Sequence, residues 1–193
     1  MAELPEGFIY RPDLISGKEE RELVERVQAI QLTHFTMRGV ESRRRVAHFG
    51  WLYSFDSWKV DPGPPIPDFL LPVRAKLAAS MKLDAESLAQ ALVIEYTPGA
   101  GIGWHRDAPP FGIVVACSLL SPCRFRLRRG SSGRTDATMT IAPRSGYVLS
   151  GAARAQWQHS ISPAKELRYS ITFRTLRSKS TASRGDKHSG VAE

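Results

Sequence analysis

The chain of 193 residues contains only two cysteines, Cys117 and Cys123. Their spacing forms no Cys-x-x-Cys zinc or redox motif, and two cysteines are too few for a disulfide framework, so a hydrophobic core must provide the stability. No apolar run is long enough to cross a membrane, and the first residues lack the pattern of a signal peptide. We therefore expect a cytoplasmic protein outside the membrane, with both thiols in its core.

Acidic side chains are also scarce, with 19 Asp and Glu against 27 Lys and Arg, so that the net charge is +8. Such an excess of positive charge suits a polyanion, and DNA or RNA is the partner that we expect. A solvated basic surface without a partner would have the same composition. We expect the protein to be a monomer.

The glycine-rich run at residues 99–103 lacks the Lys-Ser/Thr pair of a P-loop and leads into the motif His105-Arg106-Asp107 instead of a helix. In an extended segment alternate side chains share one face, so His105 and Asp107 can hold adjacent positions on one metal. His159 lies far enough along the chain for several strands to bring it back as a third ligand. Two His and one carboxylate form the facial arrangement of non-haem Fe(II) oxygenases.

A strict alternation follows at residues 168–174, where one face of the expected strand is apolar and the other is polar or cationic. The apolar face holds Tyr169, Ile171 and Phe173, and the other holds Arg168, Ser170, Thr172 and Arg174. Two guanidinium groups near a metal suit a small dianion, because guanidinium binds carboxylate bidentately. We expect 2-oxoglutarate. On a straight strand the Cα atoms of Arg168 and Arg174 lie about 20 Å apart, so both reach one short ligand only if their side chains lean inward or the strand bends.

The expected elements are helical first and β afterwards. A capping box at residues 16–19 starts one helix, which continues to about Ile30, and a second helix is expected at about residues 68–81. Short strands follow at residues 91–96, 113–120, 123–128, 138–141, 147–150, 158–161 and 168–175. This order predicts an α+β fold, in which a double-stranded β-helix, or jelly-roll, over about residues 91–175 carries the N-terminal helices on one sheet. Residues 178–193 are rich in Ser, Gly and basic residues and should be disordered.

Residues 36–66 interleave basic residues with aromatics and show no helical period. Such a segment can grip phosphates and stack bases, which makes it a candidate substrate-recognition lid. Alternatively, its aromatics, which are spaced two apart, form one buried strand face. The candidate substrate-binding residues are Arg45, Phe49, Trp51, Tyr53 and Phe55.

Three further arginines, Arg124, Arg126 and Arg128, alternate along another expected strand, with Arg129 beside them and Arg134 in the adjoining turn. One interpretation is a phosphate-binding stripe, and the other is the hydrated side of a sheet. The sequence favours neither.

The run from Glu95 to Asp107, then His159, then residues 168–174 resembles, in order and spacing, the AlkB family of Fe(II)/2-oxoglutarate-dependent dioxygenases. The resemblance implies one dioxygenase domain over residues 1–177, with Fe(II), 2-oxoglutarate and O2 as cofactors. It implies oxidative demethylation or dealkylation of damaged bases in DNA or RNA, a direct reversal that releases formaldehyde, succinate and CO2. The residues that it assigns are His105, Asp107 and His159 to iron and catalysis, and Tyr96, Arg168, Ser170 and Arg174 to 2-oxoglutarate.

Three positions depart from the family's pattern. Ile94 and Ser170 stand where asparagine is usual, and Pro109 stands where some members have an acidic residue that contacts the base. Ser170 keeps a hydroxyl that can donate a hydrogen bond, whereas Ile94 keeps none. Two alternatives therefore stay open: the same oxygenase chemistry on a protein or lipid, and a non-catalytic basic module that binds nucleic acid.

Overall fold

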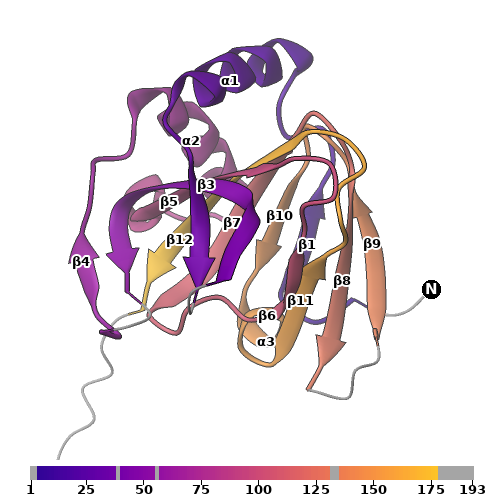
Figure 1. The fold of residues 1–193 in the computed structure, drawn as a ribbon. Coiled ribbons are helices and arrows are strands. Elements are labelled where there is room, and N and C mark those ends of the chain that lie inside the picture. The colour runs from indigo at the N-terminus through magenta and orange to yellow at the C-terminus, as the bar shows by residue number, and fades with distance from the viewer. Residues whose placement is uncertain (1–3, 38–39, 55–56, 131–134, 178–193) are drawn as a thin grey trace, which may run out of the picture.

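The computed structural model describes residues 4–37, 40–54, 57–130 and 135–177 (Figure 1). The helices are α1 (Gly17–Ala29), α2 (Leu71–Ser80), which follows the 3-10 turn η1 (Asp68–Leu70), a second 3-10 turn η2 (Ala85–Ser87), and α3 (Gly151–Ala155). The strands are β1 (Phe8–Arg11), β2 (Thr33–Met37), β3 (Val40–Tyr53), β4 (Val60–Pro62), β5 (Gln90–Tyr96), β6 (Ile102–His105), β7 (Phe111–Leu119), β8 (Cys123–Arg129), β9 (Ala137–Ile141), β10 (Gly146–Leu149), β11 (Trp157–Ile161) and β12 (Arg168–Leu176).

Two antiparallel sheets form the body of the molecule, and α1 and α2 cover the outer face of the larger one (Figure 1). The larger sheet has the order β1-β10-β7-β12-β5-β3-β2, with β4 paired to β3, and the smaller sheet has the order β6-β11-β8-β9. This arrangement confirms the expected jelly-roll with helices against one sheet. No described helix is long and apolar enough to span a membrane.

The two expected helices are present where their sequence signals lie. The Ser16 hydroxyl accepts a hydrogen bond from the Glu19 N–H, and the Glu19 carboxylate accepts one from the Ser16 N–H, so the capping box is formed. Leu23 and Val27 of α1 then pack on the large sheet. Each of the seven expected strands is found with its ends within two residues of the expectation.

The alternation along β12 divides the interior into two layers. Ile171 and Phe173 are fully buried in the core between the large sheet and the helices. On the other side of the sheet, Phe125 and Tyr147 belong to the core between the two sheets. Cys117 and Cys123 are both free and buried, as expected, and burial raises the pKa of Cys117 to about 12.

The expected lid region contains the longest strand of the structure. β3 pairs with β5 from Arg45 to Gly50 and with β4 from Trp51 onward. Gly50 has a φ of +76°, so the strand changes partner at a residue whose backbone favours glycine. The alternative interpretation of this segment as a strand is therefore correct for Val40–Tyr53, but its aromatics do not form one buried face, since Phe49 packs under the helices and Tyr53 lines a pocket. The short strands β1, β2, β4 and β6 were not expected.

Candidate active site

The two strands β6 and β11 bring the three expected metal ligands together. His105 ends β6, Asp107 lies just beyond it, and His159 is paired with His105 in the β6–β11 register. One candidate ligand atom from each residue lies within 4.8 Å of the others, and the two imidazole centroids are 4.2 Å apart. Sheet pairing thus converts a distant pair of sequence motifs into one compact cluster.

The histidine rings are held in the state that a metal requires. His105 Nδ1 lies 2.9 Å from the Gly103 carbonyl, which can only accept, so Nδ1 carries the proton and Nε2 keeps its lone pair. Phe125 stacks on His159 at 5.4 Å between centroids and fixes that ring. Burial lowers the pKa of both histidines, that of His159 to about 3, so both are neutral at pH 7.

One carboxylate oxygen of Asp107 accepts hydrogen bonds, and the other has no hydrogen-bond partner. Its Oδ1 accepts from Arg174 Nε at 2.9 Å and from Arg174 Nη2 at 2.6 Å. Burial acts to raise the pKa of Asp107, but Arg174 and the two histidines outweigh it and hold the pKa below its usual range. Oδ2 is buried without a hydrogen-bond partner and lies 3.6 Å from His159 Nε2. An unpartnered carboxylate oxygen beside imidazole nitrogens fits a divalent cation such as Fe(II).

A buried arginine of α3, Arg154, fixes the segment that carries Asp107. Its Nη2 donates to the carbonyl oxygens of Asp107 at 3.2 Å, Ala108 at 2.9 Å and Phe111 at 2.8 Å. Sequence reasoning missed this residue, because no motif or spacing marks an arginine that acts through backbone carbonyls.

Arg168 provides a place for a carboxylate. It is fully buried, its Nε donates to Ser118 Oγ at 3.1 Å, and its guanidinium lies 4.8 Å from the centroid of the Tyr96 ring. Its Nη1 and Nη2 have no hydrogen-bond partner. A buried guanidinium left unpaired costs several kcal/mol, so these two nitrogens fit a carboxylate of 2-oxoglutarate.

Three of the four residues assigned to the cosubstrate line one cavity at the metal cluster. Tyr96, Ser170 and Arg174 line it together with His105, Asp107 and His159, whereas Arg168 is not part of the lining and contacts the Tyr96 ring. Arg174, however, already binds Asp107 and donates to Gln90 Oε1 at 2.7 Å. The two arginines therefore have different neighbours, and Arg174 orients a metal ligand while it also lines the cavity. Ile94 forms an apolar wall of the same cavity.

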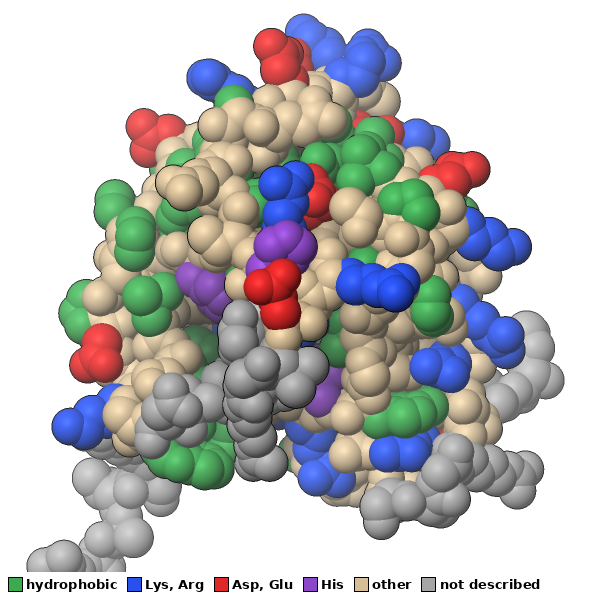
Figure 2. All heavy atoms as spheres, viewed as in Figure 1, with side chains coloured by type: hydrophobic (Ala, Val, Ile, Leu, Met, Phe, Trp, Pro, Cys, Tyr) green, Lys and Arg blue, Asp and Glu red, His purple; other side chains and the backbone are tan. Residues whose placement is uncertain are grey.

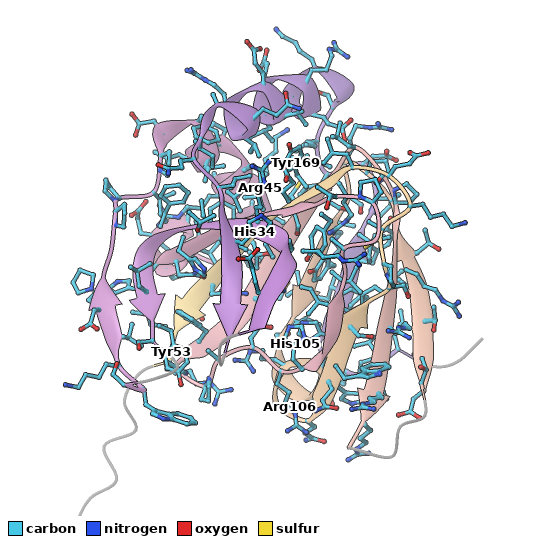
Figure 3. The ribbon with its side chains drawn as sticks, viewed as in Figure 1. His34, Arg45, Tyr53, His105, Arg106 and Tyr169 are labelled. Atoms are coloured by element: carbon cyan, nitrogen blue, oxygen red, sulfur yellow. The ribbon has the colours of Figure 1, made fainter. Side chains whose placement is uncertain are left out.

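A second pocket of about 130 Å³ opens beside the metal cluster and includes His105 and Asp107 in its wall. Arg44 and His48 of β3 line it, and Tyr53 meets Phe111 edge to face with 6.5 Å between ring centroids. Figure 3 shows Tyr53, His105 and Arg106 toward the same end of the molecule. Burial, with the charges of Arg174 and Arg44, lowers the pKa of His48 to about 4.

Of the five candidate substrate residues, the structure brings Tyr53 to this pocket. Arg45 lies on the opposite face of the sheet, where it forms a bidentate ion pair with Glu95 at 2.7 and 2.9 Å beside Tyr169 (Figure 3). Phe49 packs against the core under the helices, and Trp51 is half-buried on the β3–β4 pair outside the pocket lining. Phe55 lies outside the described residues, as does the tail at 178–193.

Strand parity explains why Arg44 and His48 were missed and Arg45 was chosen. Arg44, Val46 and His48 share the inner face of β3. Val46 is a buried apolar residue between polar neighbours, so it could have identified this face, and with it Arg44 and His48, from the sequence. The turn in the backbone at Gly50 then allows Tyr53, at an odd position like Phe49, to reach the inner side.

Comparison with known proteins agrees with this site. The family described as the 2OG-Fe(II) oxygenase superfamily matches residues 7–174. An Arabidopsis thaliana protein named "Alkylated DNA repair protein ALKBH8 homolog" is 29% identical over 180 residues, which cover 80% of this chain and 50% of that protein. The Mus musculus "tRNA (carboxymethyluridine(34)-5-O)-methyltransferase ALKBH8" is 29% identical over 168 residues, 84% of this chain and 25% of that protein. The chain thus spans half or less of the length of these relatives.

The solved structure of OsALKBH1 superposes with a TM-score of 0.70 at 17% identity and covers 90% of this chain and 98% of that one, which shows a shared fold. Fe(II), 2-oxoglutarate and O2 are the cofactors of the superfamily, as expected, and the His-Asp-His cluster is in place for the metal. The chain belongs to the 2OG-Fe(II) oxygenase superfamily, as a member of the AlkB-like family.

Proposed function

We propose that the chain oxidatively removes N-alkyl groups from bases of DNA or RNA. The observation that carries this proposal is the pocket beside His105 and Asp107, whose wall combines the aromatic rings of Tyr53 and Phe111 with the guanidinium of Arg44. Aromatic rings can stack on an unpaired base, and guanidinium groups can bind its oxygen atoms. The names of the relatives, an alkylated DNA repair protein homolog and a tRNA methyltransferase, support a nucleic-acid substrate.

Different residues of the chain would hold the metal and the cosubstrate. Bound Fe(II), with 2-oxoglutarate and O2, supplies the oxidation of a C–H bond, and the cosubstrate leaves as succinate and CO2. His105, Asp107 and His159 would hold the metal, and Arg174 keeps one oxygen of Asp107 engaged so that the other faces the cluster. Arg168 would bind a carboxylate of the cosubstrate. An N-methyl group oxidised to N-hydroxymethyl loses formaldehyde and leaves the unmodified base, which must be flipped out or single-stranded to reach the pocket.

The charges around the pocket favour a neutral lesion. Among the described residues of its wall, the only carboxylate is that of the metal ligand Asp107, which is paired with Arg174, whereas Arg44 and Arg106 supply two further guanidinium groups. A cationic base such as 1-methyladenine is repelled by these groups, whereas the carbonyl oxygens of an N-methyl pyrimidine accept hydrogen bonds from them. We therefore propose neutral methylated pyrimidines as the better substrates.

The test measures formaldehyde release from oligonucleotides that carry one 3-methylthymine, 3-methyluracil or 1-methyladenine, with Fe(II), ascorbate and 2-oxoglutarate. We expect formaldehyde from the methylated strands, fastest from the neutral lesions, and none from unmodified strands or from His105→Ala. Succinate without formaldehyde on every strand would overturn the nucleic-acid substrate and leave the oxygenase. Faster turnover of 1-methyladenine would overturn the preference for neutral bases.

A further inference from the structure

The outer face of the small sheet carries a row of arginines that are held in place. Arg126 and Arg128 of β8 lie over the Trp104 ring of β6, with guanidinium carbons 5.1 and 4.5 Å from its centroid. Arg126 Nε donates to Ser160 Oγ at 3.0 Å, and Arg128 Nε donates to Gln158 Oε1 at 2.7 Å. Stacking and neutral acceptors therefore restrict these side chains, which leaves less entropy to lose when an anion binds.

One acidic residue flanks this row: Asp136, next to β9, whose Oδ2 accepts from the backbone N–H of Arg129 at 2.6 Å. The strands β6, β8, β9 and β11 contain no Asp or Glu, and within the described part of the chain no carboxylate forms an ion pair with Arg124, Arg126 or Arg128. Folding requires only that the alternate residues Phe125 and Leu127 face the core. The outward positions of the neighbouring β9 are threonines, so arginine is not needed there to build the sheet.

Two further arginines, Arg129 and Arg106, connect the end of this row to the pocket, although Arg129 has the inward parity of Leu127. Arg129 Nη2 donates to Gln156 Oε1 at 3.1 Å, and Arg106 Nη2 donates to the carbonyl of the same Gln156 at 3.0 Å. Arg106 is exposed and forms part of the pocket wall. Figure 2 shows Lys and Arg side chains along the side of the molecule that the small sheet occupies. The positive charge of these arginines, and the contacts that connect them to the pocket wall, point to a track that leads an anionic chain to the site.

We propose that this band, defined as Arg106, Arg124, Arg126, Arg128 and Arg129 with Trp104, binds the sugar-phosphate backbone of the strand that carries the substrate base. The proposal rests on the nucleic-acid substrate proposed above. From Arg124 to Arg128 the strand advances about 13 Å, close to the rise of four stacked nucleotides at about 3.4 Å each. Contacts to phosphate carry no sequence information, so the band positions the strand without selecting its sequence.

The test is the binding of labelled, unmodified single-stranded DNA and RNA to the full chain across a salt series, followed by fluorescence anisotropy. In the triple variant R124Q/R126Q/R128Q we expect affinity to fall at least about tenfold and the slope of log K against log salt to drop by about two. The control K18Q/R21Q/R26Q removes three charges from α1, far from the band, and should stay within about twofold of the wild type.

A second variant, R124K/R126K/R128K, keeps the charge and should retain most of the affinity, which separates loss of charge from damage to the sheet. Equal affinity of the glutamine variant and the wild type for both DNA and RNA would overturn the band, and so would an equal loss in the α1 control. Because this measurement needs neither metal nor a methylated base, its result is independent of whether the chain dealkylates bases.

Discussion

Arg168 differs from the other buried arginines in what its terminal nitrogens contact. Arg74 donates from Nη1 to Glu86, and Arg154 donates from Nη2 to three carbonyl oxygens. Arg168 alone among these three has both Nη1 and Nη2 unpartnered. A fully buried group of this kind is costly in the ligand-free protein, which indicates that a bound carboxylate offsets the cost.

Replacing Arg168 should therefore weaken cosubstrate binding. In Arg168→Gln we expect the KM for 2-oxoglutarate to rise at least about tenfold, because a charge-assisted hydrogen bond to a carboxylate contributes about 2 kcal/mol or more. Initial rates of succinate formation over a range of 2-oxoglutarate concentrations measure this. The matched control is Arg74→Gln, a buried arginine paired with Glu86, which should leave KM unchanged. An unchanged KM in Arg168→Gln would exclude the assigned role.

His48 predicts a pH dependence of stability. Its folded pKa of about 4 lies below the usual 6.5, so between these values the unfolded chain binds more protons than the folded one. Stability should fall as the pH drops from about 6.5 to about 4, by up to about 2 kcal/mol between pH 7 and 5 from this residue. Urea unfolding of metal-free protein at both pH values should show a smaller loss in His48→Asn than in wild type. The exposed His34→Asn serves as control, and identical losses in His48→Asn and wild type would contradict the prediction.

At the level of single elements, β3 combines structural and site residues. Its inner face carries Arg44 and His48, its outer face carries Arg45, and Gly50 is the point at which its partner changes from β5 to β4. A Cβ at Gly50 would lie 2.1 Å from the Ala89 carbonyl oxygen. Glycine is therefore required by both the backbone angle and the close approach.

Gly50→Ala should destabilise the fold by about 2 kcal/mol or more, because it adds a steric clash to a left-handed backbone. The free energy of unfolding in urea measures the effect. Gly17→Ala is the matched control, since its added Cβ meets only Arg21 Nη1 at 3.7 Å in ordinary contact. A loss below about 0.5 kcal/mol in Gly50→Ala would show that the bend can relax.

The short helix α3 acts on the site through Arg154. Removing its three hydrogen bonds to backbone carbonyls should loosen Asp107 and lower metal affinity about tenfold in Arg154→Met, with the fold retained. Titration with Mn(II) or Fe(II) under anaerobic conditions measures affinity directly. Arg144→Met, which breaks a partly exposed pair with Glu20, provides the control. Wild-type metal affinity in Arg154→Met would contradict a positioning role.

Local patterns sufficed for β12, α1 and the pair His105 and Asp107, because alternation, a capping box and a His-x-Asp motif are each encoded within a few residues, whereas the choice of His159 needed the family resemblance. They failed for Arg44, His48 and Arg154, whose roles depend on strand parity across β3 and on a contact between α3 and a distant loop. The sequence could not decide whether the arginines of β8 form a phosphate-binding stripe or the hydrated side of a sheet. The contacts that bear on this choice are made with Trp104 and Gln158, which belong to other strands. The residues that sequence analysis found are marked by local patterns, whereas those that it missed are defined by neighbours that are distant in the sequence.

Across the whole molecule, the ion pairs of the helices contrast with the arginines of the small sheet. Glu19 pairs with Lys76 at 2.6 Å and Glu22 with Lys18 at 3.9 Å on the helical side. Within the described residues, the outer face of the small sheet has arginines and no acidic partner. The metal cluster lies between these two sides, on the inner face of the small sheet.

The most direct test that these residues form a working oxygenase site is to measure succinate formation by purified protein with Fe(II), ascorbate and 2-oxoglutarate. The measurement compares the wild type with His105→Ala, Asp107→Ala and His159→Ala. We expect turnover in the wild type and a loss of at least about hundredfold in each variant, with circular dichroism showing the fold intact. No succinate from iron-loaded wild type, or wild-type rates in any of the three variants, would contradict the assignment.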